Sequence, residues 1–128
     1  MTRRKGIKIL ILDDEPDMAE NVRRIVEAAG YDALVETDGF RALDAVEREC
    51  PELVLTDLRM PNIDGLAFLE RVKSRHPEVA VIVFTGYASE HREVAAMKKG
   101  ASDYFSKPFR PDELVLRVEK ALQRKETT

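Results

Sequence analysis

Short apolar runs alternate along this chain with longer segments in which apolar residues recur every three or four positions. Runs of the first kind are typical of buried strands, and the wider spacing is typical of amphipathic helices. Two runs, at residues 7–12 and 79–84, are almost wholly apolar, as expected for strands covered on both faces. Alternation of strand and helix favours a parallel sheet with helices on both faces. We therefore predict one α/β domain, a doubly wound (βα)5 three-layer sandwich with five parallel strands.

The other strands are expected at residues 33–35, 53–55 and 103–105, with the first of them near a sheet edge. The helix that begins at Gly39 is expected to bury three larger side chains, Phe40, Leu43 and Val46. The helix at about 90–99 has the weakest apolar face, formed by Val94, Ala95 and Met97. A face this small is consistent with an element that can shift.

The bulk composition fits a single globular domain, which we place at residues 1–124, followed by a polar tail at 125–128. A chain of 128 residues can bury about two-thirds of its unfolded surface. The net charge of −3 gives no basic excess, so nucleic acid is not expected as a direct partner. The single cysteine, Cys50, excludes a disulfide within the chain and is expected to be partly buried. No apolar run approaches the ~20 residues of a membrane span, so we expect no membrane contact and a cytoplasmic location.

The loops that follow the strands carry most of the polar chemistry. In a parallel sheet these loops all open on the same edge. Their polar side chains are Asp13, Asp14, Asp38, Asp57, Thr85 and Lys107. We expect these acidic, hydroxyl and amine groups to converge, and we expect Asp57 to face solvent at the end of its strand.

Carboxylates that crowd together repel one another unless a cation neutralises them. Oxygen ligands without suitably spaced Cys or His favour Mg²⁺ over zinc, and Asp14 and Asp57 with a backbone carbonyl would suffice. A carboxylate beside such a metal can accept a phosphoryl group, and Asp57 is the candidate. Lys107 would add a positive charge and Thr85 a hydroxyl donor. Taken singly, each residue also has a plainer interpretation, such as a helix cap for Asp13.

Four segments resemble the signature segments of bacterial response-regulator receiver domains. They are residues 10–14 (LILDD), 56–65 (TDLRMPNIDG), 84–86 (FTG) and 100–109 (GASDYFSKPF). The similarity covers nearly the whole chain in the expected order. It implies that residues 1–124 are a receiver domain with strand order 2-1-3-4-5, which makes Asp14 and Asp57 neighbours.

The resemblance also implies a role for each matching residue. Asp57 would be the phosphoacceptor, and Asp13 and Asp14 would bind Mg²⁺, the second acid directly and the first largely through water. The backbone carbonyl of Arg59 would complete the protein ligands. Arg59 and Tyr87 match positions that flank the phosphoryl group in this family.

Three further residues match the part of the family pattern that responds to phosphorylation. Lys107 would pair with the phosphoryl group and would be joined to Pro108 by a cis peptide bond. Thr85 and Tyr104 match the hydroxyl and the aromatic ring that change position on activation. For Tyr104 alone, packing in the core is the plainer interpretation.

As the resemblance implies it, the function is a phosphorylation-activated signalling switch. A sensor histidine kinase or a phosphotransfer protein would donate the phosphoryl group to Asp57, with Mg²⁺ as cofactor. The surface of the fourth helix, fifth strand and fifth helix would then change for an output domain or protein, and a homodimer on activation is allowed. The protein would not be an enzyme beyond its own phosphoryl transfer and dephosphorylation. The segments around Asp57 and Lys107 also resemble receivers that precede AAA+ transcription activators or end hybrid kinases.

Two other functions compete with this one. The first is a Mg²⁺-dependent phosphatase with an aspartyl nucleophile at the end of the first strand. That class usually has a second acid two residues after the nucleophile and a cap domain, whereas here Glu15 is followed by Pro16 and no length is spare. The second is a receiver-like binding module that works without phosphate. The sequence has no P-loop, dinucleotide fingerprint or nucleophile elbow.

Overall fold

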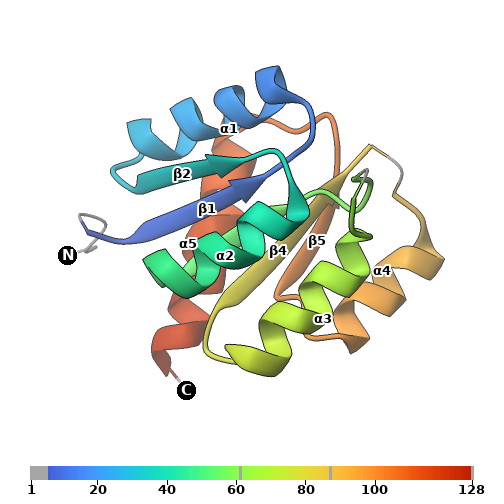
Figure 1. Ribbon diagram of the computed structural model, residues 1–128. Coiled ribbons are helices and arrows are strands. Elements are labelled where there is room, and N and C mark those ends of the chain that lie inside the picture. Colours follow the sequence, from blue (N-terminus) through green and yellow to red (C-terminus); the bar gives the residue numbers. More distant parts are fainter. Residues whose placement is uncertain (1–5, 61, 87, 128) are drawn as a thin grey trace.

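The computed structural model describes residues 6–60, 62–86 and 88–127, and they form one parallel sheet between two layers of helices (Figure 1). The strands are β1 (Lys8–Leu12), β2 (Asp32–Glu36), β3 (Leu53–Thr56), β4 (Ala80–Thr85) and β5 (Asp103–Ser106). They pair in parallel in the order β2-β1-β3-β4-β5. The predicted fold class and strand order are therefore confirmed.

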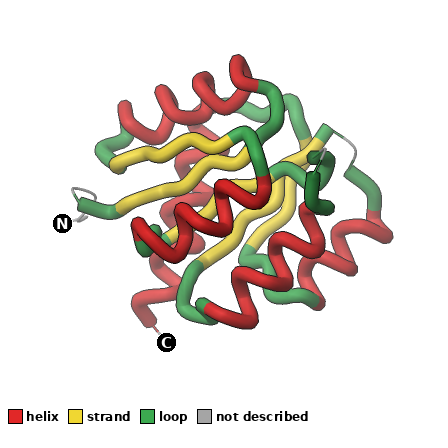
Figure 2. Tube along the Cα trace, viewed as in Figure 1, coloured by secondary structure: helices red, strands yellow, loops and turns green. Residues whose placement is uncertain are grey.

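Each strand is followed by one helix. The helices are α1 (Pro16–Ala28), α2 (Gly39–Glu49), α3 (Gly65–Arg75), α4 (Glu90–Lys98) and α5 (Pro111–Thr127). Helices α1 and α5 pack on one face of the sheet, and α2, α3 and α4 pack on the other (Figure 2). The described helices include none that is long and apolar enough to cross a membrane.

The central strands explain the apolar runs of the sequence. Leu10 and Leu12 pack in the core beneath α2 and α3, whereas Ile9 and Ile11 pack in the core beneath α1 and α5. Strands that are covered on both faces need apolar residues at every position. The edge strand β2 has no fully buried residue, in agreement with its polar neighbours in the sequence.

The predicted apolar face of α2 is partly wrong. Phe40 is 49% exposed, whereas Val46 is buried and Leu43 packs partly buried against the core, as predicted; Ala42 and Ala45 are buried as well. Phe40 lies two residues before Ala42, which is about half a turn of helix, so the two side chains point to nearly opposite sides. Ala42 and Ala45 therefore share the contact with the sheet with Leu43 and Val46.

The apolar face of α4 also differs from the prediction. Its inward residue is Ala96, which is fully buried, while Val94 is 47% and Met97 is 45% exposed. One more prediction needs correction, because Cys50 is exposed at the end of α2. Helix α5 includes residues 125–127 of the segment that is predicted to be a polar tail. No Gly or Pro follows Pro111 in this segment, so nothing in the sequence ends the helix earlier. Thr128 lies outside the described residues.

The beginning of α3 is packed directly against the loop that leaves β3. A Cβ atom at Gly65 would lie 2.5 Å from the Cα of Leu58 and 2.6 Å from the carbonyl oxygen of Asp57. The Gly65 N–H donates a hydrogen bond to the Leu58 carbonyl at 3.0 Å. The backbone around Asp57 therefore leaves no room for a side chain at position 65.

We predict that Gly65→Ala lowers the free energy of unfolding by about 1–3 kcal/mol, because the new methyl group must displace backbone atoms. Urea denaturation measures the change. Gly86→Ala is the matched control, since a Cβ atom there has no neighbour within 4 Å. Equal stability of the two variants would contradict the close packing described here.

Candidate functional site

The ends of β1 and β3 lie side by side and place two acidic residues next to each other. Leu12 pairs with Thr56 in the sheet, so Asp13 and Asp57 are the first residues beyond the paired strands. The Asp57 N–H donates to the Leu12 carbonyl at 3.1 Å, and the Asp13 N–H donates to the Glu36 carbonyl at 3.2 Å. These hydrogen bonds extend the sheet by one step and hold the backbone of both acids.

The carboxylates of Asp13, Asp14 and Asp57 form a cluster in which one oxygen atom of each lies within 4.8 Å of the others. Asp13 is fully buried and Asp57 is 5% exposed, while Asp14 is exposed. The expectation that Asp57 faces solvent is therefore wrong, and Asp14 is the acid on the open side of the cluster. The predicted convergence of Asp13, Asp14 and Asp57 is observed.

Asp38 does not join this cluster. One of its carboxylate oxygens accepts hydrogen bonds from the N–H groups of Phe40 at 2.8 Å and Arg41 at 3.0 Å, which caps α2. These hydrogen bonds, the Arg41 N–H first, hold the pKa of Asp38 below its usual value. The carboxylate serves the start of a helix, which is the common use of an Asp at this position.

Lys107 is the cation of the cluster. Its Nζ atom lies 2.8 Å from Oδ2 of Asp13 and 2.8 Å from Oδ2 of Asp57, and its side chain is 11% exposed. The Lys107 N–H donates to the Thr85 carbonyl at 2.9 Å, and the peptide bond to Pro108 is cis. Lys107 thus meets Asp13, which lies 94 positions earlier in the sequence, and Asp57, which lies 50 positions earlier.

Burial and charge act in opposite directions on these groups. Burial alone would lower the pKa of Lys107, but the hydrogen bonds and charges of Asp13 and Asp57 outweigh it, so the pKa is raised above 10.5. For Asp13, burial raises the pKa, and the hydrogen bonds from Lys107 and the Glu15 N–H offset it only in part. When the three acids are ionised and Lys107 is charged, the cluster keeps two negative charges.

This donor set fits Mg²⁺. The cluster offers carboxylate oxygens only, with no Cys or His among its members in the described part of the chain. Hard oxygen ligands on one or two carboxylates, with room for water, suit Mg²⁺ rather than zinc. The two net negative charges that remain once Lys107 is included also match the charge of a divalent cation.

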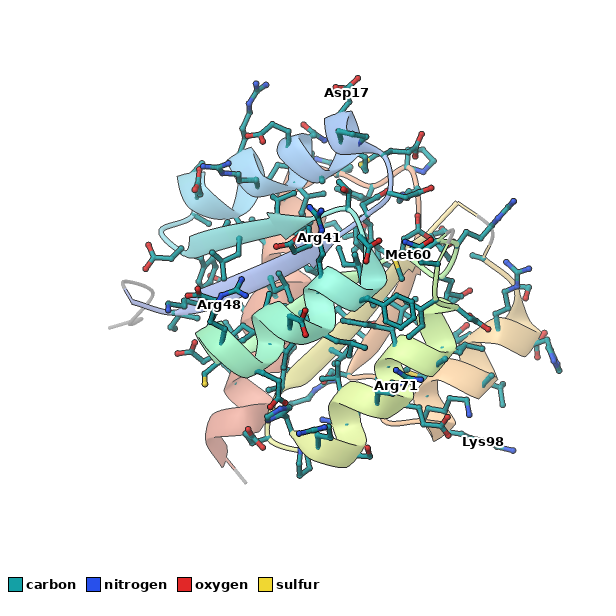
Figure 3. All side chains as sticks on the ribbon, in the orientation of Figure 1. Asp17, Arg41, Arg48, Met60, Arg71 and Lys98 are labelled. Atoms are coloured by element: carbon teal, nitrogen blue, oxygen red, sulfur yellow. The ribbon has the colours of Figure 1, made fainter. Side chains whose placement is uncertain are left out.

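The second oxygen of Asp57 is held by the loop that follows β3. Oδ1 of Asp57 accepts a hydrogen bond from the Arg59 N–H at 3.1 Å, and the Thr56 hydroxyl donates to the Asp57 carbonyl at 2.9 Å. An open pocket of about 480 Å³ adjoins this loop, and Asp14, Arg59 and Arg92 are among its lining residues. Met60, which also lines it, is labelled in Figure 3. Arg92 has no counterpart among the predicted site residues, because a single arginine on a polar helix gives no signal in the sequence.

The two predicted switch residues are both buried. Thr85 ends β4 and is fully buried, and Tyr104 on β5 is 8% exposed. The hydroxyl oxygen of Tyr104 accepts a hydrogen bond from the Ser89 N–H at 3.3 Å. Ser89 is the N-cap of α4, so Tyr104 connects β5 to the start of that helix. Tyr87 lies outside the described residues.

Comparisons with known proteins show which family and fold this chain resembles. The family model of the response regulator receiver domain matches residues 9–119. The nitrogen assimilation regulatory protein NtrX of Azorhizobium caulinodans is 41% identical over 117 residues, which are 90% of this chain and 26% of that protein. A CheY-like response regulator receiver domain protein from Methanospirillum hungatei has a TM-score of 0.91 at 30% identity, with 98% of each chain covered. The beryllofluoride-activated receiver domain dimer of NtrC4 has a TM-score of 0.88 at 29% identity, with 92% of this chain and 98% of that chain covered.

The present chain thus spans about a quarter of the length of NtrX. The family match includes all five strands except the first residue of β1. From this match and the sheet order β2-β1-β3-β4-β5, the chain belongs to the family of response-regulator receiver domains of two-component systems.

Proposed function

We propose that this chain is a phosphorylation-dependent switch in which Asp57 accepts a phosphoryl group from the phosphohistidine of a kinase or a phosphotransfer protein. The observation that carries the proposal is the acidic cluster itself. Three carboxylates lie within 4.8 Å of one another, and Lys107 contacts two of them at 2.8 Å. Such a site can hold a divalent cation and neutralise the charge of an incoming phosphoryl group.

Asp13, Asp14 and Asp57 with the carbonyl of Arg59 would hold Mg²⁺, which when bound offsets negative charge on the phosphoryl oxygens. In the transfer step, a carboxylate oxygen of Asp57 forms the new bond to phosphorus. The bond from phosphorus to the imidazole nitrogen breaks, and its electron pair stays on the nitrogen. Lys107 stabilises the phosphoryl oxygens, while the Arg59 N–H keeps the Asp57 carboxylate oriented.

The conformational response is proposed to pass through Thr85 and Tyr104 to the surface of α4, β5 and α5. A phosphoryl group adds up to two negative charges beside Thr85, whose hydroxyl would then donate to it. Tyr104 would move into the space that Thr85 leaves. The packing of α4 supports this route, because Ala96 is its only buried residue among those described. Coupling of this kind typically amounts to about 1–3 kcal/mol.

Receiver domains work with kinases and with output domains. Because this chain spans only about a quarter of NtrX, we propose that its output lies in further sequence or in a separate protein. A solution structure of the beryllofluoride-activated receiver domain of NtrC4 is a dimer. Val94 and Met97, both nearly half exposed on α4, are suited to such a contact here.

Phosphoryl labelling tests whether Asp57 is the acceptor. Incubation with acetyl phosphate and Mg²⁺ should add one phosphoryl group to the wild type, and Asp57→Asn should abolish the gain because the amide is no nucleophile. Intact-mass spectrometry measures the product. Asp17→Asn, which removes an exposed acid in the first turn of α1, should label like the wild type.

Two outcomes would contradict the assignment. Undiminished labelling of Asp57→Asn would place the acceptor elsewhere. Steady turnover of p-nitrophenyl phosphate by the wild type, lost in Asp13→Asn or Asp14→Asn but kept in Asp57→Asn, would instead favour the phosphatase.

The second prediction concerns the metal. Mg²⁺ at 100 times its dissociation constant should stabilise the wild type by about 2.7 kcal/mol, because only the folded chain gathers the ligands. Asp14→Asn should need a higher Mg²⁺ concentration for the same increase in Tm. Asp17→Asn, whose position is labelled in Figure 3, serves again as the control. An identical Mg²⁺ response of all three proteins would exclude Asp14 as a ligand.

The third prediction concerns pH. In metal-free buffer, Lys107→Met should lower the free energy of unfolding by up to about 3 kcal/mol, because the carboxylates lose their buried counterion. The folded pKa of Lys107 lies above its unfolded value of 10.5, so its contribution is fully present below pH 10.5. It is lost as the pH rises through the folded pKa. Urea midpoints of the two proteins should therefore converge at high pH, and a constant difference would contradict the role of the ammonium.

A further inference from the structure

The loop after β3 is attached to the start of α2 by residues that are not members of the acidic cluster. The side-chain amide of Asn62 donates a hydrogen bond to Oδ2 of Asp38. The other oxygen of Asp38 accepts from the N–H groups of Phe40 and Arg41. One carboxylate therefore holds both the first turn of α2 and a residue 24 positions later in the chain.

A steric contact lies next to this hydrogen bond. A Cβ atom at Gly39 would lie 1.9 Å from Cγ2 of Ile63, so the glycine permits the side chain to approach the helix backbone. Ile63 is 7% exposed and packs in the core beneath α2 and α3. Two neighbouring loop residues thus dock on two neighbouring residues at the start of α2.

The segment between this docking point and the acceptor contains Arg59. At the end of this segment nearer to Asp57, Leu58 is 6% exposed, and the Leu58 backbone is packed against Gly65. Arg59 itself is exposed, yet its N–H donates to Oδ1 of Asp57 at 3.1 Å. The anchors on either side of Arg59 thus restrain the backbone that carries its peptide groups.

We propose that Asp38 and Asn62 are a positioning pair, which holds the loop so that the peptide groups of Arg59 face the carboxylate cluster and thereby strengthens Mg²⁺ binding. The inference rests on the proposed function, since it concerns the metal that this site would hold. Neither residue belongs to the cluster. The hydrogen bond has an ionised acceptor, which makes it stronger than a bond between neutral groups.

The pair also suits a role in positioning because of its location. Asn62 is exposed and Asp38 is half-buried outside the core, so removing the hydrogen bond leaves no unpartnered polar atom in the core. Ile63 keeps the loop docked when Asn62 is changed. Loss of the pair is therefore expected to affect the orientation of the loop more than the stability of the fold.

The experiment compares Asn62→Ala with Asn21→Ala, a matched change on the exposed side of α1. Isothermal titration calorimetry measures Mg²⁺ binding. The affinity of Asn62→Ala should fall about 10-fold, the lower end of the range for residues that orient metal ligands. The amide NMR signal of Arg59 should shift in this variant, and the urea midpoint should stay close to that of the wild type. Asn21→Ala should change none of these.

An exchange of the two groups separates positioning from a general effect of mutation. Asn62→Asp alone places two carboxylates together and should weaken Mg²⁺ binding at least as much as Asn62→Ala. The double variant Asp38→Asn/Asn62→Asp restores an amide and a carboxylate in reversed places, and an amide oxygen at position 38 still caps α2. Its Mg²⁺ affinity should return to within about 3-fold of the wild type. That difference is smaller than the loss of about 10- to 100-fold that is typical when a residue that orients a metal ligand is changed.

The outcomes distinguish this inference from the proposed function. If the wild type binds Mg²⁺ and is labelled on Asp57, but Asn62→Ala binds Mg²⁺ equally well, the positioning pair is rejected and the proposed function stands. A loss in Asn62→Ala that the double variant does not recover also rejects the pair. If the wild type neither binds Mg²⁺ nor is labelled, both proposals fail.

Discussion

The repulsion between carboxylates at the end of β1 and β3 is the constraint on which this structure depends. Asp13 and Asp57 are both buried, and Lys107 contacts each of them at 2.8 Å. Without that cation, two like charges would be held together in a region that excludes water, where electrostatic interactions are strong. The sheet order brings these charged groups together, because β1 and β3 are neighbours and Lys107, which follows β5, lies at the same edge of the sheet. The site is thus a consequence of topology, with its charge only partly balanced.

Most of the sheet and the residues of this cluster could be predicted because each leaves a local signal. A strand that is covered on both faces must be apolar throughout, and residues 7–12 and 79–84 have few alternatives. The acids that follow the apolar runs at residues 7–12 and 53–55 are equally visible. The sequence does not show which of these acids gather. Asp13, Asp14 and Asp57 form the cluster and Asp38 does not, because the outcome depends on strand order and on which N–H groups lie near each carboxylate.

The errors in the helices have a common physical origin. A hydrophobic pattern identifies candidates for burial, but the side of the helix that faces the sheet decides which of them are buried. Ala42 of α2 and Ala96 of α4 are buried, and the larger Phe40 and Met97 remain near half exposed. Small residues give a weak signal in the sequence because they are apolar without being bulky. The Asn62 contact to Asp38 left no signal at all, since both are common turn and cap residues.

The same contrast in packing bears on the switch that we propose, in which a charge at Asp57 would act on α4. Strands β3 and β4 are buried along their whole length, so the backbone that carries Asp57 and Thr85 cannot easily yield. Helix α4 has one buried residue among those described and is connected to β5 by a hydrogen bond from the Ser89 N–H to Tyr104. Under the proposed function, a phosphoryl group on Asp57 would move α4 more readily than the sheet, because an element with little apolar contact moves at the lowest cost in free energy. The weak packing of α4 is therefore the property that would let this domain change shape while its sheet stays intact.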